Sequence, residues 1–580
     1  MFLGIVPSNN GRHHDPSACL VDDGEILAYV EEERITRDKH AHGEFPVNAV
    51  TECLEIAGAD LTDVAAIGLS RNYDNRKKAT GRLARRALRS THTPLVERLH
   101  DATILPLKQR VTMTNGTLRS LTRTKLARHL GTDADSVPPV QCLNHHRTHA
   151  ASAFYPSGFD EALVVSLDNY GGHLSTVVYK GSGDELVSIK SFPRFNSFGR
   201  FYSDITDFLG FRRSNGEGKV MGLAPYGRED ANIGRVIADY IEYGDGEYNT
   251  EALTYRETGD AVRKLERDLA VEQRYWREEI RQVHKDIAYH AQATVEAAVS
   301  DLVAHYLDRT GAENVCLAGG VALNCKMNKR IRELPGVSDM FVQPAANDAG
   351  GSIGAALALS VANGSTAAEM RHPYHGTRYT TAEIREELDS LKVSYEVLDD
   401  VEAKAASLIA DGRLVGWFQG AMEGGPRALG NRSILADPRS VDSRDRVNRH
   451  VKHREEWRPF APSMLRAEAD RFLDGAISKA AYFMIDTYET TERAREEIPA
   501  VLHPEDETTR PQIVDADRNE RYHGLLRELK AETGVGAVLN TSFNDSGEPI
   551  VRTPREAVRD FYSMGLDDLV IGDVLVQKDG

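Results

Sequence analysis

Cysteine is scarce in this sequence, with only five residues in a chain of 580: Cys19, Cys53, Cys142, Cys316 and Cys325. Their number is odd and no two of them form a Cys-x-x-Cys pair, which excludes a disulfide framework and a thiolate zinc site. Each cysteine is therefore expected to behave as a small buried hydrophobic residue.

Long apolar runs are missing as well, and none approaches the roughly 20 residues that a membrane-spanning helix needs. The first residues, MFLGIVPSNNGRHHDPS, become polar too early for a secretory signal. We therefore expect a cytoplasmic protein without a membrane partner. A chain of 580 residues is too long for one ordinary core, so two or more domains are expected.

The chain also lacks an excess of positive charge. Its net charge is −17, which argues against a nucleic-acid partner. Only the segment 71–131 runs against this balance, with fifteen Lys and Arg and three acidic residues. Three interpretations stay open for it: a pair of solvated amphipathic helices, a basic wall near an anionic ligand, or a contact with the acidic remainder of the protein.

The N-terminal half contains the same order of elements twice. FLGIV, SACLV and EILAYVEEE read as three strands joined by a glycine loop and a turn, and EALVVSLD, LSTVVYKG and LVSIKSF repeat them roughly 160 residues later. The pattern then turns helical over 262–308, and two units of strand, glycine loop and helix follow. This order predicts a duplicated α/β core, with glycine loops suited to phosphate groups.

A second α/β domain is predicted from about residue 379. The segment 361–378, VANGSTAAEMRHPYHGTR, breaks the apolar periodicity and marks the boundary. Beyond it we expect strands near LVGWFQG and GAVLNTSFN, and helices around 400–411 and 554–564. We accordingly divide the chain into domains at 1–365 and 375–580.

Three histidines open a small-residue helix in LNHHRTHAASAFYP, residues 143–156. His145 and His149 are four residues apart and would project from one helix face, as metal ligands do. Asp168 at the end of EALVVSLD and Asp348 in NDAGG could join them across the cleft of a duplicated core, giving a site for Fe²⁺, Mn²⁺ or Zn²⁺. Buried, hydrogen-bonded histidines, an Asx-type turn at Asp168 and a helix cap at Asp348 are the alternatives.

Cations gather on glycine-rich turns in the second domain. GAMEGGPRALGNRSILADPR and NRHVKHREEWRPFAPSML place five of them within about thirty residues: Arg427, Arg432, Lys452, Arg454 and Arg458. Fixed cations on such turns suit a phosphate ligand. LNTSFNDSGEPIV adds polar side chains after a buried strand, which could bind a carbamoyl or nucleotide group; for either segment alone, a polar turn capped by its own side chains is the alternative.

The chain resembles the NodU/CmcH family of O-carbamoyltransferases. The motifs that carry the resemblance occur in order along both domains: HHDPSACL (13–20), EEERITRDKH (31–40), HHRTHAASAFYPS (145–157), FGRFYSDITDFLGF (198–211), GEGKVMGLAPYG (216–227), LAGGVALN (317–324), PRALGNRSILADPR (426–439), VKHREEWRPFAP (451–462) and LNTSFNDSGEPIV (539–551).

This resemblance implies a fold and a reaction. The N-terminal part would be similar to the actin-like ATPase superfamily domain (ASKHA) of the tRNA threonylcarbamoyl transferases, and the C-terminal part to the YrdC fold. The YrdC-like domain would make carbamoyl-AMP from carbamoyl phosphate and ATP with Mg²⁺. The N-terminal domain, with Fe²⁺ or another divalent ion, would then transfer the carbamoyl group to a hydroxyl of a small-molecule acceptor, such as a natural product or antibiotic.

The resemblance also implies roles for individual residues, carried over by motif. The metal ligands would be His145, His149, Asp168 and Asp348, while His146 supports the turn, and His14 would deprotonate the acceptor hydroxyl, a role that suits the near-neutral pKa of histidine. Carbamoyl phosphate and ATP would contact Arg427, Lys452, Arg458, Asn540 and Ser542. Weaker candidates for adenylate contacts are Lys39, Lys219, Gly319, Gly320 and Asn324.

One loop departs from the family pattern. Where most members carry Asp-Gly-x-Gly-Glu, this chain reads Asp-Asn-Tyr-Gly-Gly over 168–172, which puts loop shape and acceptor recognition in doubt. Two other functions are retained as alternatives: threonylcarbamoyl transfer to tRNA, and a non-catalytic nucleotide-sensing role. A homodimer is an expectation at the level of the family.

Overall fold

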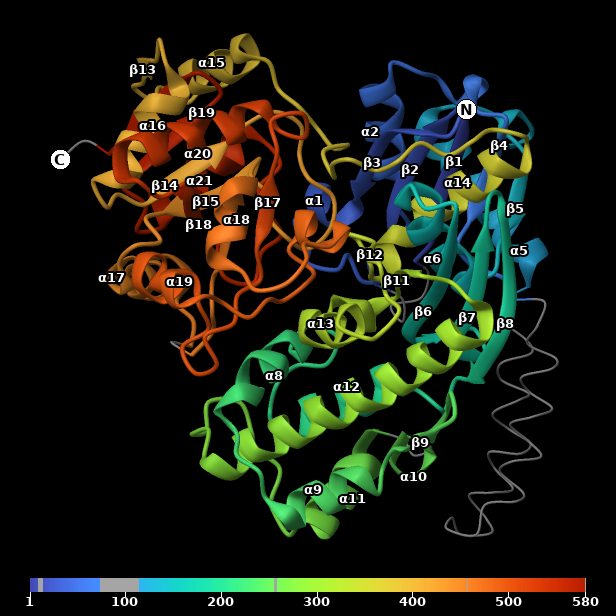
Figure 1. Ribbon diagram of the computed structural model, residues 1–580. Coiled ribbons are helices and arrows are strands. Elements are labelled where there is room, and N and C mark those ends of the chain that lie inside the picture. Colours follow the sequence, from blue (N-terminus) through green and yellow to red (C-terminus); the bar gives the residue numbers. More distant parts are fainter. Residues whose placement is uncertain (9–13, 74–113, 255–257, 456, 579–580) are drawn as a thin grey trace.

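Two five-stranded sheets form the core of the N-terminal half in the computed structural model, which describes residues 1–8, 14–73, 114–254, 258–455 and 457–578 (Figure 1). The first has the order β3-β2-β1-β4-β5 and the second β8-β7-β6-β11-β12. Their strands are β1 Phe2–Val6, β2 Ser17–Asp22, β3 Glu25–Glu31, β4 Ala66–Leu69, β5 Val140–Cys142, β6 Glu161–Gly171, β7 Leu174–Ser182, β8 Glu185–Pro193, β11 Asn314–Ala318 and β12 Asp339–Val342.

Both sheets have one topology. In each, three consecutive strands pair antiparallel and two later strands extend the first of them in parallel. The predicted duplicated α/β core is therefore confirmed. One detail differs, because Asp168 lies inside β6 rather than at its end. The pairing of β6 with β7 is irregular between Leu167 and Gly171, and Asp168 is within this irregularity.

Two helices lie against these sheets and carry the predicted metal ligands. Helix α6 (His145–Phe154) begins after Asn144, whose side chain accepts a hydrogen bond from Arg147 N, and α14 (Gly351–Ala362) follows the short turn η6 (Asp348–Gly350). α14 packs on α6, β1 and β2. A Cβ on Gly354 would lie 1.7 Å from Thr148 O, so the two helices touch backbone to backbone. This contact holds the two ligand-bearing segments in fixed positions.

The remaining helices of this half surround the sheets and extend below them in Figure 1: α1 Glu32–Thr36, α2 Val47–Ala57, α5 Asn115–Leu130, α7 Phe198–Phe208, α8 Glu217–Leu223, α9 Ala231–Ala238, α10 Glu251–Thr254, α11 Thr258–Leu269, α12 Gln282–Thr310 and α13 Cys325–Arg332, with a hairpin of β9 Glu242–Gly244 and β10 Glu247–Asn249. The helical pattern of 262–308 is thus two helices, separated by a connection over 270–281. Most of the basic segment (74–113) lies outside the described residues, and its C-terminal part contains α5.

The C-terminal half is built on one eight-stranded sheet of order β13-β20-β19-β14-β15-β18-β16-β17. Its strands are β13 Glu396–Val397, β14 Val415–Phe418, β15 Arg432–Ala436, β16 Ala461–Leu465, β17 Gln512–Val514, β18 Ala537–Ser542, β19 Asp568–Ile571 and β20 Val574–Gln577. Its helices are α15 Thr381–Ser390, α16 Val401–Ala410, α17 Val441–Arg446, α18 Arg466–Phe472, α19 Glu492–Glu497, α20 Glu520–Thr533 and α21 Pro554–Ser563. The strands and helices predicted here are confirmed by β14, β18, α16 and α21.

No helix or strand occurs between Ala362 and Thr381, where α14 ends and α15 begins. The two halves are nevertheless tied together by buried polar contacts. Arg34 of α1 is paired with Glu31 and donates to Gly425 O at 2.7 Å, while Gly425 N donates to Glu31 at 3.1 Å. A second link is the ion pair of Glu52 and Arg552 at 2.9 Å. α1 thereby fixes the N-terminal half against a glycine-rich loop of the C-terminal half.

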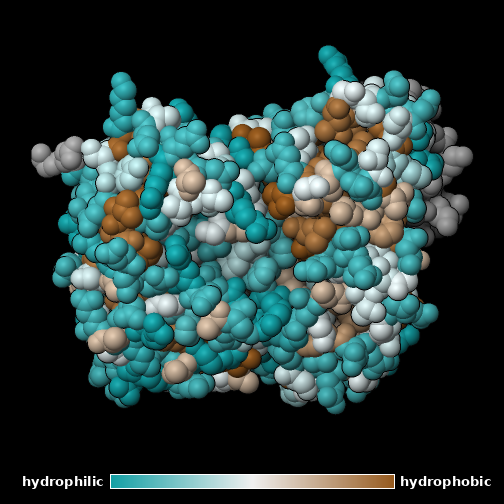
Figure 2. Space-filling view, turned by 90° about the horizontal axis from the view of Figure 1, so that it is seen from above, coloured by the Kyte–Doolittle hydropathy of each residue, from teal (hydrophilic) through white to brown (hydrophobic). Residues whose placement is uncertain are grey.

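The face seen from above is mostly hydrophilic, with hydrophobic side chains in small groups on both halves (Figure 2). Within the described part of the chain, no helix combines the length and apolar character needed to cross a membrane.

Candidate functional site

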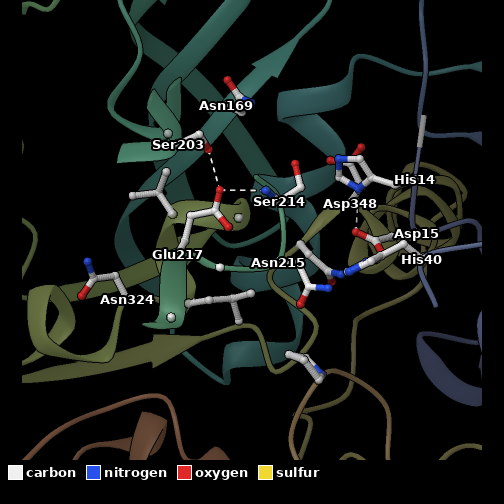
Figure 3. A pocket seen from close by; sticks show the side chains of 18 of the residues that line it. His14, Asp15, His40, Asn169, Ser203, Ser214, Asn215, Glu217, Asn324 and Asp348 are labelled. Carbon is white, nitrogen blue, oxygen red and sulfur yellow. Dashed lines mark hydrogen bonds and ion pairs between the residues drawn. The ribbon is translucent and has the colours of Figure 1, made fainter. Parts of the chain in front are cut away.

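One cavity of about 1830 Å³ has walls from both halves of the chain. Its N-terminal wall includes His14, His145, Asp168 and Asp348, and its C-terminal wall includes a group of cations (Arg427, Lys452, Arg454, Arg458 and Arg510). In Figure 3, His14, Asp15, His40 and Asp348 gather on one side, and Ser203, Ser214 and Glu217 form a hydrogen-bonded group beside them. The residues predicted for two separate functions thus face the same space.

The four predicted metal ligands converge. One ligand atom from each of His145, His149, Asp168 and Asp348 can be chosen so that all lie within 4.8 Å of one another. His145 Nε2 is 3.0 Å from Asp168 Oδ2, and His145 Nε2 and His149 Nε2 are each 3.6 Å from Asp348 Oδ1. α6 supplies both histidines, β6 one aspartate and the start of η6 the other.

The donor set fits a divalent metal ion. Both ring nitrogens of His149 are buried and lack a hydrogen-bond partner among the described residues, which a metal ligand would explain. Two imidazoles and two carboxylates suit Fe²⁺, Mn²⁺ or Zn²⁺. Burial would raise the pKa of Asp348, but His145 and its neighbours hold it well below the usual range. The third histidine of the motif is not in the group: His146 is fully buried and its Nδ1 lies 2.8 Å from Ser166 Oγ.

A second polar group lies beside the metal group. The carboxylate of Asp15 joins two imidazoles, with His14 Nδ1 2.7 Å from Oδ2 and His40 Nδ1 2.7 Å from Oδ1. Burial would lower the pKa of His14, but the hydrogen bond to Asp15 and the charges of Asp15 and of the two ligand aspartates raise it to about 10. Burial would likewise raise the pKa of Asp15, and the two histidines hold it well below its usual range. Since Nδ1 faces Asp15, Nε2 of His14 is the nitrogen left for chemistry.

The C-terminal wall concentrates positive charge, and no acidic residue of this half is among the described residues that line the cavity. Burial and the neighbouring Arg510 lower the pKa of Arg427 to about 9, and Nε of each of these two side chains is buried without a hydrogen-bond partner among the described residues. Burial and the charge of Arg510 also lower the pKa of Arg458, whose one ion pair in the described chain is with Glu455 at 3.8 Å. Such a group requires an anion to balance it, and phosphate oxygens match its geometry.

Lys452, Asn540 and Ser542 complete this wall. Lys452 Nζ contacts Ser542 O at 2.5 Å and Asn544 Oδ1 at 3.1 Å, and burial and Arg454 lower its pKa. Asn540 Nδ2 donates to Ala428 O at 3.1 Å, and its Oδ1 is buried without a partner in the described chain. All three predicted residues therefore line the cavity, Asn540 and Ser542 from β18 and Lys452 from the end of the short helix Val447–Lys452.

Of the five weaker candidates for adenylate contacts, four line the cavity: Lys39, Lys219, Gly320 and Asn324. The fifth, Gly319, does not. Gly319 has a φ of +91°, and a Cβ there would lie 2.1 Å from Leu167 O, so this glycine serves backbone packing. Lys219 is already paired with Glu455 of the C-terminal half at 2.8 Å, and Asn324 caps α13 by accepting from Met327 N.

Arg432 was predicted to belong to a phosphate-binding group of cations in the second domain, and this prediction is wrong. Arg432 is fully buried in β15, and its guanidinium donates to four backbone oxygens (Thr377, Gln419, Gly420 and Asn431) and stacks on Phe418. It therefore holds a loop rather than a ligand. Its spacing from Arg427 in sequence gave no sign of this difference.

Two family models cover almost the whole chain, one described as carbamoyltransferase N-terminus over residues 8–357 and one as carbamoyltransferase C-terminus over 406–578. The chain belongs to the carbamoyltransferase family. It is an enzyme that carbamoylates.

Curated relatives agree with this assignment. The carbamoyltransferase is 36% identical to nodulation protein NolNO of Sinorhizobium fredii, over 97% of this chain and 79% of that protein. It is 39% identical to nodulation protein NolO of Bradyrhizobium diazoefficiens, over 75% and 79%. It is also 34% identical to 3'-hydroxymethylcephem-O-carbamoyltransferase of Amycolatopsis lactamdurans, over 45% and 48%. Likeness to the solved structure of T. kodakarensis HypF is distant, with 14% identity and a TM-score of 0.35 over 62% of this chain and 47% of that one.

Three residues of the carbamoyltransferase cavity were missed by sequence reasoning. Arg510 lies 83 residues from Arg427, in a segment without glycine-rich turns, and no local signal marks it. Asp15 and His40 belong to motifs that carried the resemblance, yet no role was predicted for either. An acid next to His14 was the available signal for Asp15.

Proposed function

We propose that this carbamoyltransferase is an ATP- and carbamoyl phosphate-dependent O-carbamoyltransferase that acts on the hydroxyl group of a small molecule. A YrdC-like C-terminal half would form carbamoyl-AMP, and the N-terminal half would transfer the carbamoyl group. The division at 1–365 and 375–580 assigns one step to each half. The named activity of the cephem O-carbamoyltransferase relatives supports a small-molecule acceptor.

A single observation carries this proposal. The cation group of the C-terminal half and three of the four proposed metal ligands of the N-terminal half (His145, Asp168 and Asp348) line one cavity of about 1830 Å³. A reactive adenylate formed at one group could reach the other without entering bulk solvent, and shielding from water matters for an intermediate that hydrolyses easily.

In the adenylating step, water hydrolyses carbamoyl phosphate: the bond to the phosphoryl group breaks, and carbamate and inorganic phosphate are formed. An oxygen of carbamate then attacks the α-phosphorus of ATP, and pyrophosphate leaves with its bonding electrons. Arg427, Lys452 and Arg458 would bind the phosphate groups, with Arg510 beside them, while Asn540 and Ser542 would hold the carbamoyl amide. These fixed cations stabilise the negative charge that develops on the oxygens of the transferred phosphoryl group and of the leaving pyrophosphate.

In the transfer step, the acceptor hydroxyl attacks the carbamoyl carbon and AMP leaves. The Nε2 atom of His14 would take the hydroxyl proton, while Asp15 keeps Nδ1 protonated and orients the ring. Lys39 and the amide of Gly320 line the same space and would contact the adenylate. A neutral His14 is required for this role.

His145, His149, Asp168 and Asp348 would hold the metal ion, for which Fe²⁺ is the proposed identity. Bound there, a divalent ion supplies positive charge that stabilises oxyanions. The same charge offsets the two ligand aspartates, which help to raise the pKa of His14, and so favours the neutral imidazole.

Pyrophosphate release from ATP tests the proposal. The purified protein is assayed with and without carbamoyl phosphate and in the absence of acceptor. We expect pyrophosphate release to depend on carbamoyl phosphate and to be lost in Arg427→Ala. The control is His14→Ala, which should still form the adenylate but should not transfer the carbamoyl group. Pyrophosphate release that does not depend on carbamoyl phosphate, or that persists in Arg427→Ala, would contradict the adenylation step.

A further inference from the structure

Among the described lining residues, each carboxylate on the N-terminal side of the cavity already has a partner inside the protein. Among its described lining residues, four are acidic: Asp15, Asp168, Glu217 and Asp348. Two of these belong to the metal-ligand group, and Asp15 is held between two imidazoles. Glu217 Oε1 accepts hydrogen bonds from Ser203 Oγ at 2.6 Å and from Ser214 N at 2.8 Å. The acids described on this wall are thus engaged within the protein, Glu217 through its Oε1 atom.

Positive charge, in contrast, remains on this wall. Arg212 lines the cavity on the connection after α7, and no ion pair or hydrogen bond of its side chain occurs among the described residues. It lies close to the histidines of the proposed transfer site: burial lowers the pKa of His42, as do the charges of His14, His40 and Arg212. The ring of His42 is 6.0 Å from that of His14. Arg212 therefore shares the cavity wall with His14, the group that would take the proton of the acceptor hydroxyl.

An aromatic face lies at the metal-ligand end of the same wall. Tyr170 is 43% exposed although it is a large apolar side chain, and it follows the ligand Asp168 by two residues. The guanidinium of Arg194 lies 4.4 Å from the ring centroid of Tyr170. This cation–π contact restricts the movement of the ring. Tyr170 lies near the end of β6, in the segment 168–172 that departs from the family pattern. Exposed aromatic rings at a cavity wall are typical contacts for flat or ring-shaped ligands.

We propose that the acceptor is an anionic molecule whose hydroxyl is carried on a ring, with its acidic group bound by Arg212 and its ring face against Tyr170. A carboxylate or a phosphate ester meets this description, whereas a polyamine such as an amino sugar does not. This inference rests on the proposed O-carbamoyl transfer, because it concerns the acceptor side of the same cavity.

Three matched probes test the charge preference: 4-nitrophenyl β-D-glucuronide, the corresponding glucoside and the corresponding 2-amino-2-deoxyglucoside. They share a ring and an aglycone and are anionic, neutral and cationic. Binding to the full-length protein is measured by calorimetry with saturating AMP and phosphate, which fill the nucleotide positions. We expect the glucuronide to bind about tenfold more tightly than the glucoside, as one charge-assisted contact allows. The amino sugar should bind most weakly.

Variants then assign the preference to residues. Arg212→Gln should remove the preference for the glucuronide and leave the affinity for the glucoside unchanged, whereas Tyr170→Ala should weaken all three probes. Arg235→Gln, an exposed arginine of α9 away from the cavity, is the matched control. Equal binding of the three probes, a preference that persists in Arg212→Gln, or a preference lost in Arg427→Ala would each overturn the proposal. Pyrophosphate release by the unaltered protein, measured in parallel, reports separately on the adenylation proposal.

Discussion

Gly171 lies directly against the imidazole of His145. A Cβ at position 171 would come within 1.9 Å of His145 Cδ2, a distance that side chains do not tolerate. The glycine is in β6, three residues after Asp168, and it lets the strand pass close to the start of α6. The position of His145, one of the proposed metal ligands, is therefore set by the absence of a side chain on a neighbouring strand.

Replacing this glycine should disturb the metal group. In Gly171→Ala the imidazole of His145 must move, and we expect metal affinity to fall about 10- to 100-fold, the range seen when groups that orient metal ligands are lost. Metal content after dialysis against graded chelator measures it. Gly218→Ala is the control, because a Cβ there meets no atom within 4 Å. Equal metal retention in both variants would contradict the role given to Gly171.

Asp15 should act through His14 rather than on the substrate. Asp15→Asn removes the charge that holds the ring through Nδ1, so we expect the kcat of carbamoyl transfer to fall about 10²-fold, with a smaller change in acceptor KM. Pyrophosphate release without acceptor should persist, because Asp15 is on the N-terminal wall. Asp23→Asn, on the exposed turn between β2 and β3, is a suitable comparison. A parallel loss of pyrophosphate release would show that Asp15 supports the whole cavity instead.

Metal binding should release protons from the histidines. Without a metal ion, the pKa of His14 is raised to about 10, so His14 carries a proton near pH 8, and the charges of Asp348 and Asp168 raise the pKa of His145 above its ordinary value. A divalent ion must displace the proton of His145 and disfavours that of His14 by its charge. Calorimetric titration with Mn²⁺ in buffers of different ionisation enthalpy counts these protons. We expect His14→Asn to release fewer protons than the unaltered protein; identical counts would refute the coupling.

Elements with a strong local pattern were predictable from sequence, and the contacts that define the site were only partly so. The strands around Phe2–Val6 and Glu161–Gly171 show clear apolar runs between turns, which is why the duplicated core could be inferred. The spacing of His145 and His149 was enough to predict that both project from one face of a helix. The break at 270–281 was missed because charged residues continue on both sides of it, and helical periodicity fixes a helix end poorly.

Contacts between distant segments carry no local signal. The pairing of Lys219 with Glu455 spans 236 residues, and nothing in either motif indicates that this lysine is already engaged. The same applies to the position of Arg510 beside Arg427. The arginines of the motif PRALGNRSILADPR look equivalent in sequence, although the backbone places Arg427 on a cavity and Arg432 inside a strand.

That contrast leads to a prediction about stability. Arg427 is a partly buried cation beside other cations, whereas Arg432 donates to four backbone oxygens. Arg427→Met should raise the free energy of unfolding of the ligand-free protein by about 1 kcal/mol, because an uncompensated charge leaves the interior. Arg432→Met should lower it by about 3 kcal/mol, because buried carbonyl oxygens lose a charged donor.

Urea unfolding with and without ATP distinguishes the two roles. ATP should stabilise the unaltered protein by binding only its folded form, and this gain should vanish in Arg427→Met. It should persist in Arg432→Met, provided that the variant folds at the lower temperature chosen for the assay. Destabilisation of ligand-free Arg427→Met would mean that this guanidinium has a structural partner, and the argument that the cation group requires an anion would fail with it.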